Sequence, residues 1–418
     1  MTDRISRTTL ESGLRIVSEP LPHLRSVTLG AWVGTGARDE TDALSGASHF
    51  LEHLLFKGSD TRSAREIAEM VEAVGGEMNA FTAHEQTVFY LRVPDDQLEL
   101  GVDVLCDVLW RPAFRADEVD CERQVILEEI AMRDDTPDDL VHDVFAEAVF
   151  AGHVLSRAVI GFPATIEAMT PSAIASYHAE HYRSTNTVFA AAGNFDEDRL
   201  RALVEQHSPV PRSDRPIRPL GDPTAAPDAV TVVERDTEQA HVVLGMRSLP
   251  HLDPDRYALM VLNQVLGGGM ASRLFQEVRE ARGLAYSVYS FRAAYQDTGC
   301  LGVYAGTSVE RVHETLDLVH EQFDRLVTEG TITVRELDAA KGNMRGSLAM
   351  SLETSSSRMH RIGRAELVDA EIPSLDEVAR RVDAVSLDDI ARVVDRVVRD
   401  QPRVLSAVGP FTAGSFER

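Results

Sequence analysis

Two histidines four residues apart, His49 and His53, are the residues whose types and spacing most directly suggest chemistry. They lie in the run 43–56, which lacks proline and has apolar residues along one side, a pattern that predicts a helix. Four residues make about one helical turn, so both imidazoles project from one face and can share a divalent metal ion. With Glu52 the order is H-x-x-E-H, the reverse of H-E-x-x-H, whose glutamate is the general base on a metal-bound water.

Two histidines do not complete a zinc site, and the same pair could simply be packed histidines of an ordinary helix. A third ligand must come from another element. The predicted helix 116–133 carries four glutamates, Glu118, Glu122, Glu128 and Glu129. Glu122 and Glu129 are two turns apart and share a partly apolar face, where a carboxylate is costly unless it is paired or metal-bound. From the residues alone, ordinary solvated glutamates stay the alternative.

The composition predicts a protein of two or more domains in a reducing compartment. The chain has 418 residues, 44% of them hydrophobic, and three cysteines without C-x-x-C spacing. Its first residues contain no apolar signal-peptide core, so we expect a cytoplasmic protein with no membrane segment. The net charge of -25 disfavours nucleic acid as a partner and is compatible with cationic partners or with solubility alone.

Alternating hydrophobic patterns and turn signals divide the chain into strands and helices. Strands are expected at 8–19, 26–36, 77–82, 86–91 and 187–195, and helices at 64–74, across most of 96–149, at 171–182 and up to 207. The composition changes between 208 and 228, where six of the eighteen prolines fall: Pro209, Pro211, Pro216, Pro219, Pro223 and Pro227. This stretch is predicted to be an extended linker.

Short sequence echoes on either side of the linker indicate a duplication. Leu29-Gly30 recurs as Leu244-Gly245, and the segments starting at Met169 and Ala192 recur at Val385 and Val408. The copies differ where a metal would sit, because moving His49, Glu52 and His53 forward by 215 positions gives Gln264, Gly267 and Gly268. The second copy therefore cannot hold a metal ion in the same way.

The motif HFLEHLLFKG, followed by VILEEI, resembles the inverted-zincin metallopeptidases: mitochondrial processing peptidase, pitrilysin and insulin-degrading enzyme. The similarity extends over the whole chain, and its size is closest to bacterial homologues of the processing peptidase. The resemblance implies an α+β fold of two homologous domains, each a mainly antiparallel sheet covered by helices and forming half of a clamshell chamber. Residues 1–207 would be the metal-binding catalytic domain, 208–228 the linker and 229–418 the copy without metal.

The resemblance also assigns roles to residues. It implies one Zn²⁺ per chain held by His49, His53 and Glu129, with Glu52 as general base and Glu122 as a carboxylate that supports the ligands. In the second copy, Arg279 and Tyr286 match an arginine and a tyrosine that reach the substrate across the chamber. A guanidinium can hold a peptide carbonyl, and a phenol can donate to a developing oxyanion. Without the resemblance they would be an exposed helix arginine and a strand tyrosine.

Substrate contacts follow from the same resemblance. An extended peptide is expected to add to the edge strand around Asn79, Ala80 and Phe81. Phe56 matches a wall for an apolar residue after the cut, and Asp139 and Asp143 match positions that hold a substrate arginine, with helix capping as the alternative for both.

The predicted function is therefore zinc-dependent endoproteolysis of unstructured or presequence-like peptides. Relatives of this size work as pairs of chains, so a homodimer is expected, or a heterodimer with an inactive homologue. The alternative is a non-catalytic, zinc-bearing assembly subunit of the same fold. The peptidase is favoured because His49, Glu52, His53 and Glu129 are all present together with Arg279 and Tyr286.

Overall fold

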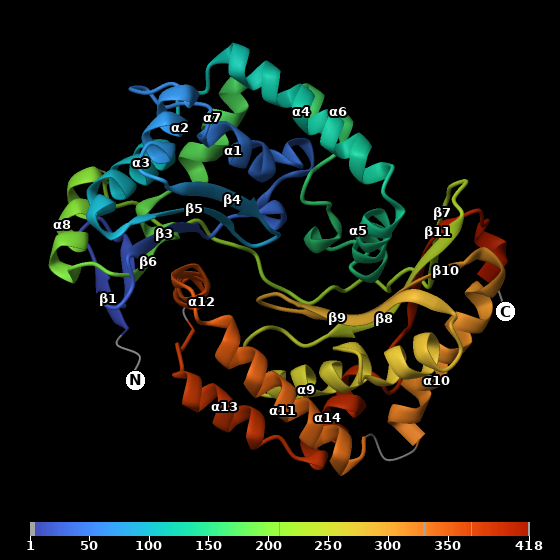
Figure 1. Ribbon diagram of the computed structural model, residues 1–418. Coiled ribbons are helices and arrows are strands. Elements are labelled where there is room, and N and C mark those ends of the chain that lie inside the picture. The colour runs from blue at the N-terminus through green and yellow to red at the C-terminus, as the bar shows by residue number, and fades with distance from the viewer. Residues whose placement is uncertain (1–4, 209, 329–331, 369, 417–418) are drawn as a thin grey trace. The chain divides into compact units, whose positions relative to one another are not determined.

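The computed structural model describes residues 5–208, 210–328, 332–368 and 370–416, so Pro209 of the predicted linker lies outside the described residues. The chain forms two compact units. Unit 1 consists of Met1–Ile130, Arg157–Arg218 and Ala349–Ser374, and unit 2 of Ala131–Ser156, Pro219–Leu348 and Leu375–Arg418. Each unit is an α+β assembly with its own sheet, as the sequence predicts (Figure 1).

The sheet of unit 1 has six strands in the order β1-β2-β6-β3-β5-β4. Their bounds are β1 Ser6–Thr9, β2 Arg15–Pro20, β3 Ser26–Val33, β4 Glu77–Thr82, β5 Thr87–Pro94 and β6 Thr187–Gly193. Only β2 and β6 run parallel. The sheet is thus mainly antiparallel, with β4 at one edge.

Helices cover both faces of this sheet. One face is covered by α1 Ala47–Leu55, α2 Ala64–Glu72, α3 Leu98–Trp110, α4 Ala116–Asp134, α7 Pro171–His181 and α8 Glu197–His207. A short helix, α6 Pro163–Ala168, contributes Ile166 to the same core. On the other face lies α12, Ser355–Leu367, whose Met359 and Ile362 pack against Trp32. Alternation along β3 sends Leu29 and Ala31 into the first core and Trp32 into the second.

The sheet of unit 2 has five strands in the order β7-β11-β8-β10-β9. They are β7 Val230–Glu234, β8 Gln239–Ser248, β9 Ala285–Ala294, β10 Gly299–Ser308 and β11 Val404–Gly409. Again one pair is parallel, β7 with β11, and the others are antiparallel. The five strands correspond in the same order to β2-β6-β3-β5-β4 of unit 1, with β8 in the place of β3 and β11 in the place of β6. The shared topology is what a duplicated sequence would produce.

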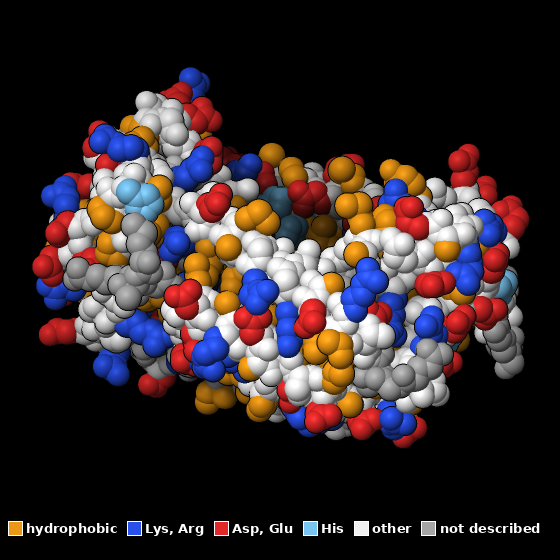
Figure 2. All heavy atoms as spheres, turned by 60° about the horizontal axis from the view of Figure 1, so that its bottom comes forward, with side chains coloured by type: hydrophobic (Ala, Val, Ile, Leu, Met, Phe, Trp, Pro, Cys, Tyr) orange, Lys and Arg blue, Asp and Glu red, His pale blue; other side chains and the backbone are white. Residues whose placement is uncertain are grey.

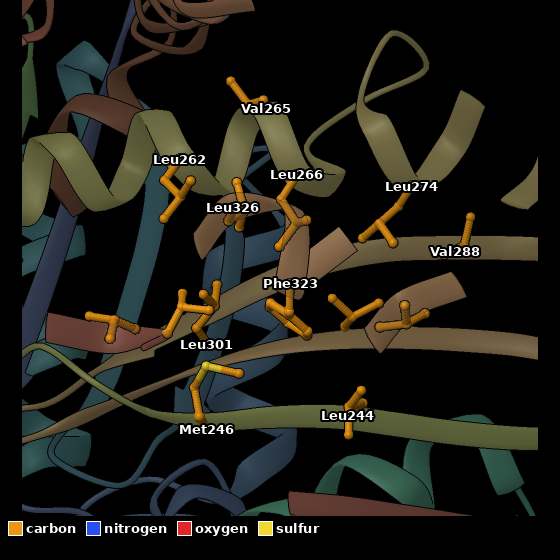
Figure 3. Packing of buried hydrophobic residues seen from close by; sticks show 14 of the residues in the cluster. Leu244, Met246, Leu262, Val265, Leu266, Leu274, Val288, Leu301, Phe323 and Leu326 are labelled. Atoms are coloured by element: carbon orange, nitrogen blue, oxygen red, sulfur yellow. The ribbon is translucent and has the colours of Figure 1, made fainter. Parts of the chain in front are cut away.

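The main core of unit 2 lies between its sheet and five helices. These are α9 Arg256–Gly267, α10 Val312–Thr328, α11 Val334–Ser351, α13 Leu375–Asp383 and α14 Leu387–Val397. Figure 3 shows Leu262 and Leu266 of α9 pointing toward the sheet that carries Leu301 and Met246, with Val265 on the opposite side of the helix. The other sheet face is covered by α5, Pro137–Val149.

The units are interleaved in the sequence. Helix α5 belongs to the sheet of unit 2 although it precedes the linker, and α12 belongs to the sheet of unit 1 although it follows the linker. The compact units therefore differ from the sequential halves 1–207 and 229–418. The sequence echoes do not reveal this exchange, because they identify which elements correspond and not which sheet each helix covers.

The Leu-Gly echo has a packing explanation. A Cβ on Gly30 of β3 would lie 2.4 Å from Met359 Sδ of α12, and one on Gly245 of β8 would lie 2.7 Å from Phe145 Cζ of α5. In each unit the glycine lets one side chain of the exchanged helix reach the sheet.

Several predicted boundaries differ from the structure by one to four residues, and two of the differences change an element near the chain start or the metal motif. The stretch 8–19 is a hairpin of β1 and β2, turned at Gly13 with φ of 86°, and not one strand. The metal-motif helix begins at Ala47 instead of Ala43, because Gly46 has φ of 93° and interrupts the run. Neither difference moves His49 or His53 off the helix.

Candidate metal centre

Helix α1 presents His49 and His53 on the side away from its apolar residues. Phe50, Leu51 and Leu54 are buried in the core of unit 1, whereas both histidines are half-buried. The start of α1 is held by Glu40, whose two oxygens accept hydrogen bonds from Gly46 N at 2.8 Å and Ser48 N at 2.7 Å. Burial raises the pKa of Glu40 to about 8, and the two N–H donors oppose this rise. Glu40 thus fixes the end of the helix next to His49.

Helix α4 brings its carboxylates to the histidines. Its buried stripe contains Ile126, Ile130 and, as its one charged member, Glu122, whose side chain is 4% exposed. Glu122 Oε2 lies 3.1 Å from His53 Nδ1, and Oε1 lies 2.7 Å from Lys57 Nζ. These two partners compensate the burial of the carboxylate.

Three side-chain atoms of unit 1 converge in the spacing of a zinc site. His49 Nε2 is 3.7 Å and His53 Nε2 is 3.5 Å from the same oxygen, Glu129 Oε2. A tetrahedral zinc ion with bonds of about 2.0–2.1 Å separates its ligand atoms by about 3.3–3.4 Å. Each histidine nitrogen therefore lies within a few tenths of an ångström of this spacing from the Glu129 oxygen, and the ligand atoms of the three residues all lie within 4.8 Å of one another. The Glu129 side chain is 38% exposed, so the group is open to solvent on that side.

The surroundings of the two histidines suit metal binding. Burial, and then the neighbouring His53, lower the pKa of His49 to about 4, so its imidazole is neutral at pH 7. For His53, a proton on Nδ1 can be donated to Glu122, which leaves the Nε2 lone pair facing Glu129. Two imidazoles and one carboxylate are a known catalytic zinc set, and the residues present fit that ion.

Glu52 lies beside this group without belonging to it. Burial raises the pKa of the Glu52 carboxyl above its ordinary value, and the charge of Glu129 adds to the rise. Hydrogen bonds with the side chain and the main chain of Thr82 oppose it. A carboxylate with a raised pKa, held next to the metal ligands, suits a group that accepts and then returns a proton.

The predicted substrate residues of unit 1 lie near the same elements. Asn79, Ala80 and Phe81 belong to β4, which pairs only with β5 in the described part of the chain, so its other edge is open to a further strand. Asn79 is exposed. Phe56 follows the last residue of α1 and packs edge-to-face on Phe89, with ring centroids 5.7 Å apart.

The structure places Asp139 and Asp143 in unit 2, on the first turns of α5. Asp143 Oδ2 is 2.6 Å from Arg133 Nη1 and is thereby neutralised. Asp139 is exposed and makes no ion pair within the described residues. Of the two predicted arginine-binding carboxylates, Asp139 is the one left available.

Arg279 and Tyr286, both in unit 2, are neighbours. The Arg279 guanidinium carbon lies 4.8 Å from the ring centre of Tyr286 and 4.8 Å from that of Phe275. Arg279 sits in the π-helical turn η6, Phe275–Glu280, and Tyr286 is the second residue of β9, with 79% of its surface exposed. The stacking orients an arginine and a phenol together toward solvent.

Sequence reasoning assigned no role to three residues of the centre: Lys57, Glu40 and Thr82. Lys57 follows His53 by four positions, so helical periodicity could have identified it. Glu40 lies outside any helix and Thr82 is a strand residue, so only the fold shows that they hold α1 and Glu52.

The fold and this site define an α+β protein of two like units, in which the described residues form a His₂Glu group that could hold a metal ion. Residues 15–162 match the family described as Insulinase (Peptidase family M16), and residues 168–344 match Peptidase M16 inactive domain. The chain is 46% identical over 415 residues to an uncharacterized zinc protease of Streptomyces coelicolor, covering 97% of this chain and 90% of the relative. It is 39% identical over 382 residues to one of Bacillus subtilis, covering 91% and 93%.

Solved structures agree on the fold. A protease from Helicobacter pylori superimposes with a TM-score of 0.90 at 24% identity, covering 97% of this chain and 99% of that one. A peptidase M16 inactive domain from Pseudomonas fluorescens gives 0.91 at 23% identity, covering 98% of each. The chain belongs to the insulinase family, peptidase family M16, which confirms the resemblance seen in the motif.

No helix in the described ranges is long and apolar enough to cross a membrane. Figure 2 shows acidic and basic side chains intermixed over the face in view.

Proposed function

We propose that this chain is a zinc-dependent endopeptidase that hydrolyses unstructured or presequence-like peptides. The observation that carries the proposal is the convergence of His49 Nε2, His53 Nε2 and Glu129 Oε2, with the Glu52 carboxylate beside them. Homologues named zinc proteases support the same reading. Zinc bound there would act as a Lewis acid on a water molecule and on the scissile carbonyl.

The chain's own residues would supply the remaining steps. Glu52, oriented by Thr82, accepts the proton of the attacking water and returns it to the leaving amine. Glu122 holds the orientation of His53, and Lys57 balances the Glu122 charge. The open edge of β4 binds the substrate main chain in extended form, so recognition depends little on sequence.

Unit 2 would complete the site. Arg279 and Tyr286 are proposed to hold the substrate carbonyl and to donate to the developing oxyanion. Closure of the two units into a chamber, pairing of two chains and a cytoplasmic location belong to the same proposal. Family membership supports the chamber and the pairing, and the composition supports the location.

A cleavage assay tests this function. Purified full-length protein is incubated with a basic unstructured peptide, with and without a chelator, and products are mapped by mass spectrometry. We expect internal cleavage that the chelator abolishes, that Zn²⁺ restores, and that Glu52→Gln reduces by roughly 10²–10⁴-fold. Zinc binding without cleavage would favour the non-catalytic assembly subunit instead.

A further inference from the structure

Unit 2 contains a pocket at the position that corresponds to the metal centre of unit 1. In chain order, α9 corresponds to α1 and α11 to α4, since each pair flanks equivalent strands. The pocket lies between α9, the glycine-rich loop after it and α11. Its volume of about 430 Å³ is in the range of small-ligand sites, roughly 300–1,000 Å³.

The ion pair that supports the metal centre recurs beside this pocket. In unit 1 Lys57 pairs with Glu122 of α4; in unit 2 Arg273 forms two hydrogen bonds with Glu336 of α11, at 2.6 and 2.9 Å. Arg273 follows Lys57 by 216 positions and Glu336 follows Glu122 by 214. The framework of the site is therefore present in both copies.

The metal ligands have been replaced by amides and glycine. Asn343 follows Glu129 by 214 positions and Gln264 follows His49 by 215, and both line the pocket. Gly268 takes the place of His53, and a Cβ there would lie 2.4 Å from Gln264 Oε1. The glycine thus makes room for the Gln264 side chain, which donates to Gly268 O at 3.2 Å. Amide side chains do not bind zinc well, but they can donate to and accept from a peptide group.

The rest of the pocket wall is mainly apolar, with a buried serine and an arginine that makes no ion pair among the described residues. Val265, Met270, Ala271, Ala339 and Ala340 form the apolar part of the wall. Figure 3 shows Val265 on the side of α9 away from the sheet. Ser272 is 5% exposed, and its hydroxyl has no hydrogen-bond partner among the described residues. Arg335 is exposed at the pocket and makes no ion pair in the described part of the chain, whereas Arg273 and Glu336 balance each other.

We propose that this pocket binds the carboxyl-terminal residue of a peptide that ends in an aliphatic side chain. The Arg335 guanidinium matches the terminal carboxylate, and Gln264 and Asn343 match the last main-chain amide. Val265 and the alanines of α11 cover the side chain. This binding site is separate from the metal centre and does not depend on the proposed hydrolysis.

The test uses N-acetylleucine as the probe and N-acetylleucinamide, which lacks the carboxylate, as its matched control. Binding to the full-length protein is followed by saturation-transfer NMR titration. A ligand of this size is expected to bind with a dissociation constant on the order of 1 mM. We expect about tenfold weaker binding of the amide, and about tenfold weaker binding of N-acetylleucine to Arg335→Gln.

Two substitutions on α11 locate the site. Ala339→Trp fills the pocket from an exposed position and should abolish binding, whereas Ser347→Trp, exposed on the same helix outside the pocket, should leave it unchanged. Thermal unfolding confirms that both variants are folded. A third variant, Glu129→Gln stripped of metal, tests whether binding takes place at this pocket or at the metal centre. It should bind N-acetylleucine as tightly as the unsubstituted chain does.

Three results would overturn the proposal. The first is that N-acetylleucine shows no saturable binding up to tens of millimolar. The second is that it binds folded Ala339→Trp as well as the unsubstituted chain. The third is that the metal-stripped Glu129→Gln protein no longer binds it. The last result would place the carboxylate at the metal centre.

Discussion

His53 Nδ1 lies 3.1 Å from Glu122 Oε2, so the orientation of a proposed zinc ligand depends on a buried carboxylate of another helix. We predict that Glu122→Gln lowers zinc affinity about 10–100-fold, because the amide keeps the shape but loses the charge that His53 and Lys57 face. Competition with a chelator measures this affinity. Glu128→Gln, at an exposed position of the same helix, should leave it unchanged. An unaltered affinity in Glu122→Gln would remove the supporting role.

Substitutions of Glu129 and Glu52 should affect metal binding and proton transfer separately. Glu129→Gln replaces a proposed ligand and should reduce the zinc content after dialysis. Glu52→Gln should retain about one zinc ion per chain while turnover is lost, since Glu52 lies outside the converging atoms. Elemental analysis of both purified variants decides the matter. Loss of zinc from Glu52→Gln would show that the roles are wrongly assigned.

Much of this arrangement could be predicted because it is local or repeated. Helical periodicity puts His49 and His53 on one face, and the echo of Thr170 in Ser386 marks two helix N-caps, each accepting a hydrogen bond from the residue three positions on. Glu129 could be connected to the histidines only through the family resemblance. Periodicity along α4 does not say which helix its face meets.

The features that sequence reasoning missed are those set by tertiary packing. The start of α1 depends on Glu40, a buried carboxylate from a segment without regular structure. At the exchanged helices α5 and α12, Phe145 and Met359 closely approach glycines of the sheets that they cover. A linear pattern carries no signal for either contact.

Arg279 and Tyr286 should act as a unit. Arg279→Ala and Tyr286→Phe are each predicted to lower kcat, by roughly ten- to a thousandfold, with zinc content and folding intact. Because the guanidinium stacks on the phenol ring at 4.8 Å, the two losses should not add in the double variant. Arg282→Ala, at an exposed arginine paired with Glu277, serves as the control. Full activity in both single variants would mean that Arg279 and Tyr286 take no part in catalysis.

The Glu336–Arg273 pair predicts a pH dependence of stability. Burial alone would raise the pKa of Glu336, but hydrogen bonds from Arg273 and Thr333 lower it to about 2. The folded-state pKa is below the ordinary value, so the stabilisation is present above about pH 4.5 and is lost as the pH falls toward 2.

Glu336→Gln should therefore lower the free energy of unfolding by about 1 kcal/mol at pH 7, a value discounted for solvent screening. The difference from the unsubstituted chain should shrink as the pH falls below 4.5. Urea denaturation of both proteins at several pH values measures it. Glu314→Gln, which breaks an exposed pair with Arg311, should cost under about 0.5 kcal/mol. A difference that grows on acidification would contradict the assignment.

Substrate preference is the prediction most changed by the structure. On the proposed function, peptides with arginine shortly before the scissile bond and a bulky apolar residue after it should be cut fastest. Asp143 is already paired with Arg133 at 2.6 Å, whereas Asp139 is exposed and unpaired within the described residues. A substrate guanidinium can therefore reach Asp139 directly but must compete with Arg133 for Asp143.

Three variants examined with a peptide library distinguish these carboxylates. Asp139→Asn should reduce the enrichment of arginine, and Asp143→Asn should reduce it less. Arg133→Gln frees Asp143, so it should strengthen the preference and lower KM for arginine peptides several-fold, since a second carboxylate becomes available to the guanidinium. If all three variants keep the preferences of the unsubstituted chain, both aspartates serve only the first turns of α5, where acidic residues stabilise the helix dipole.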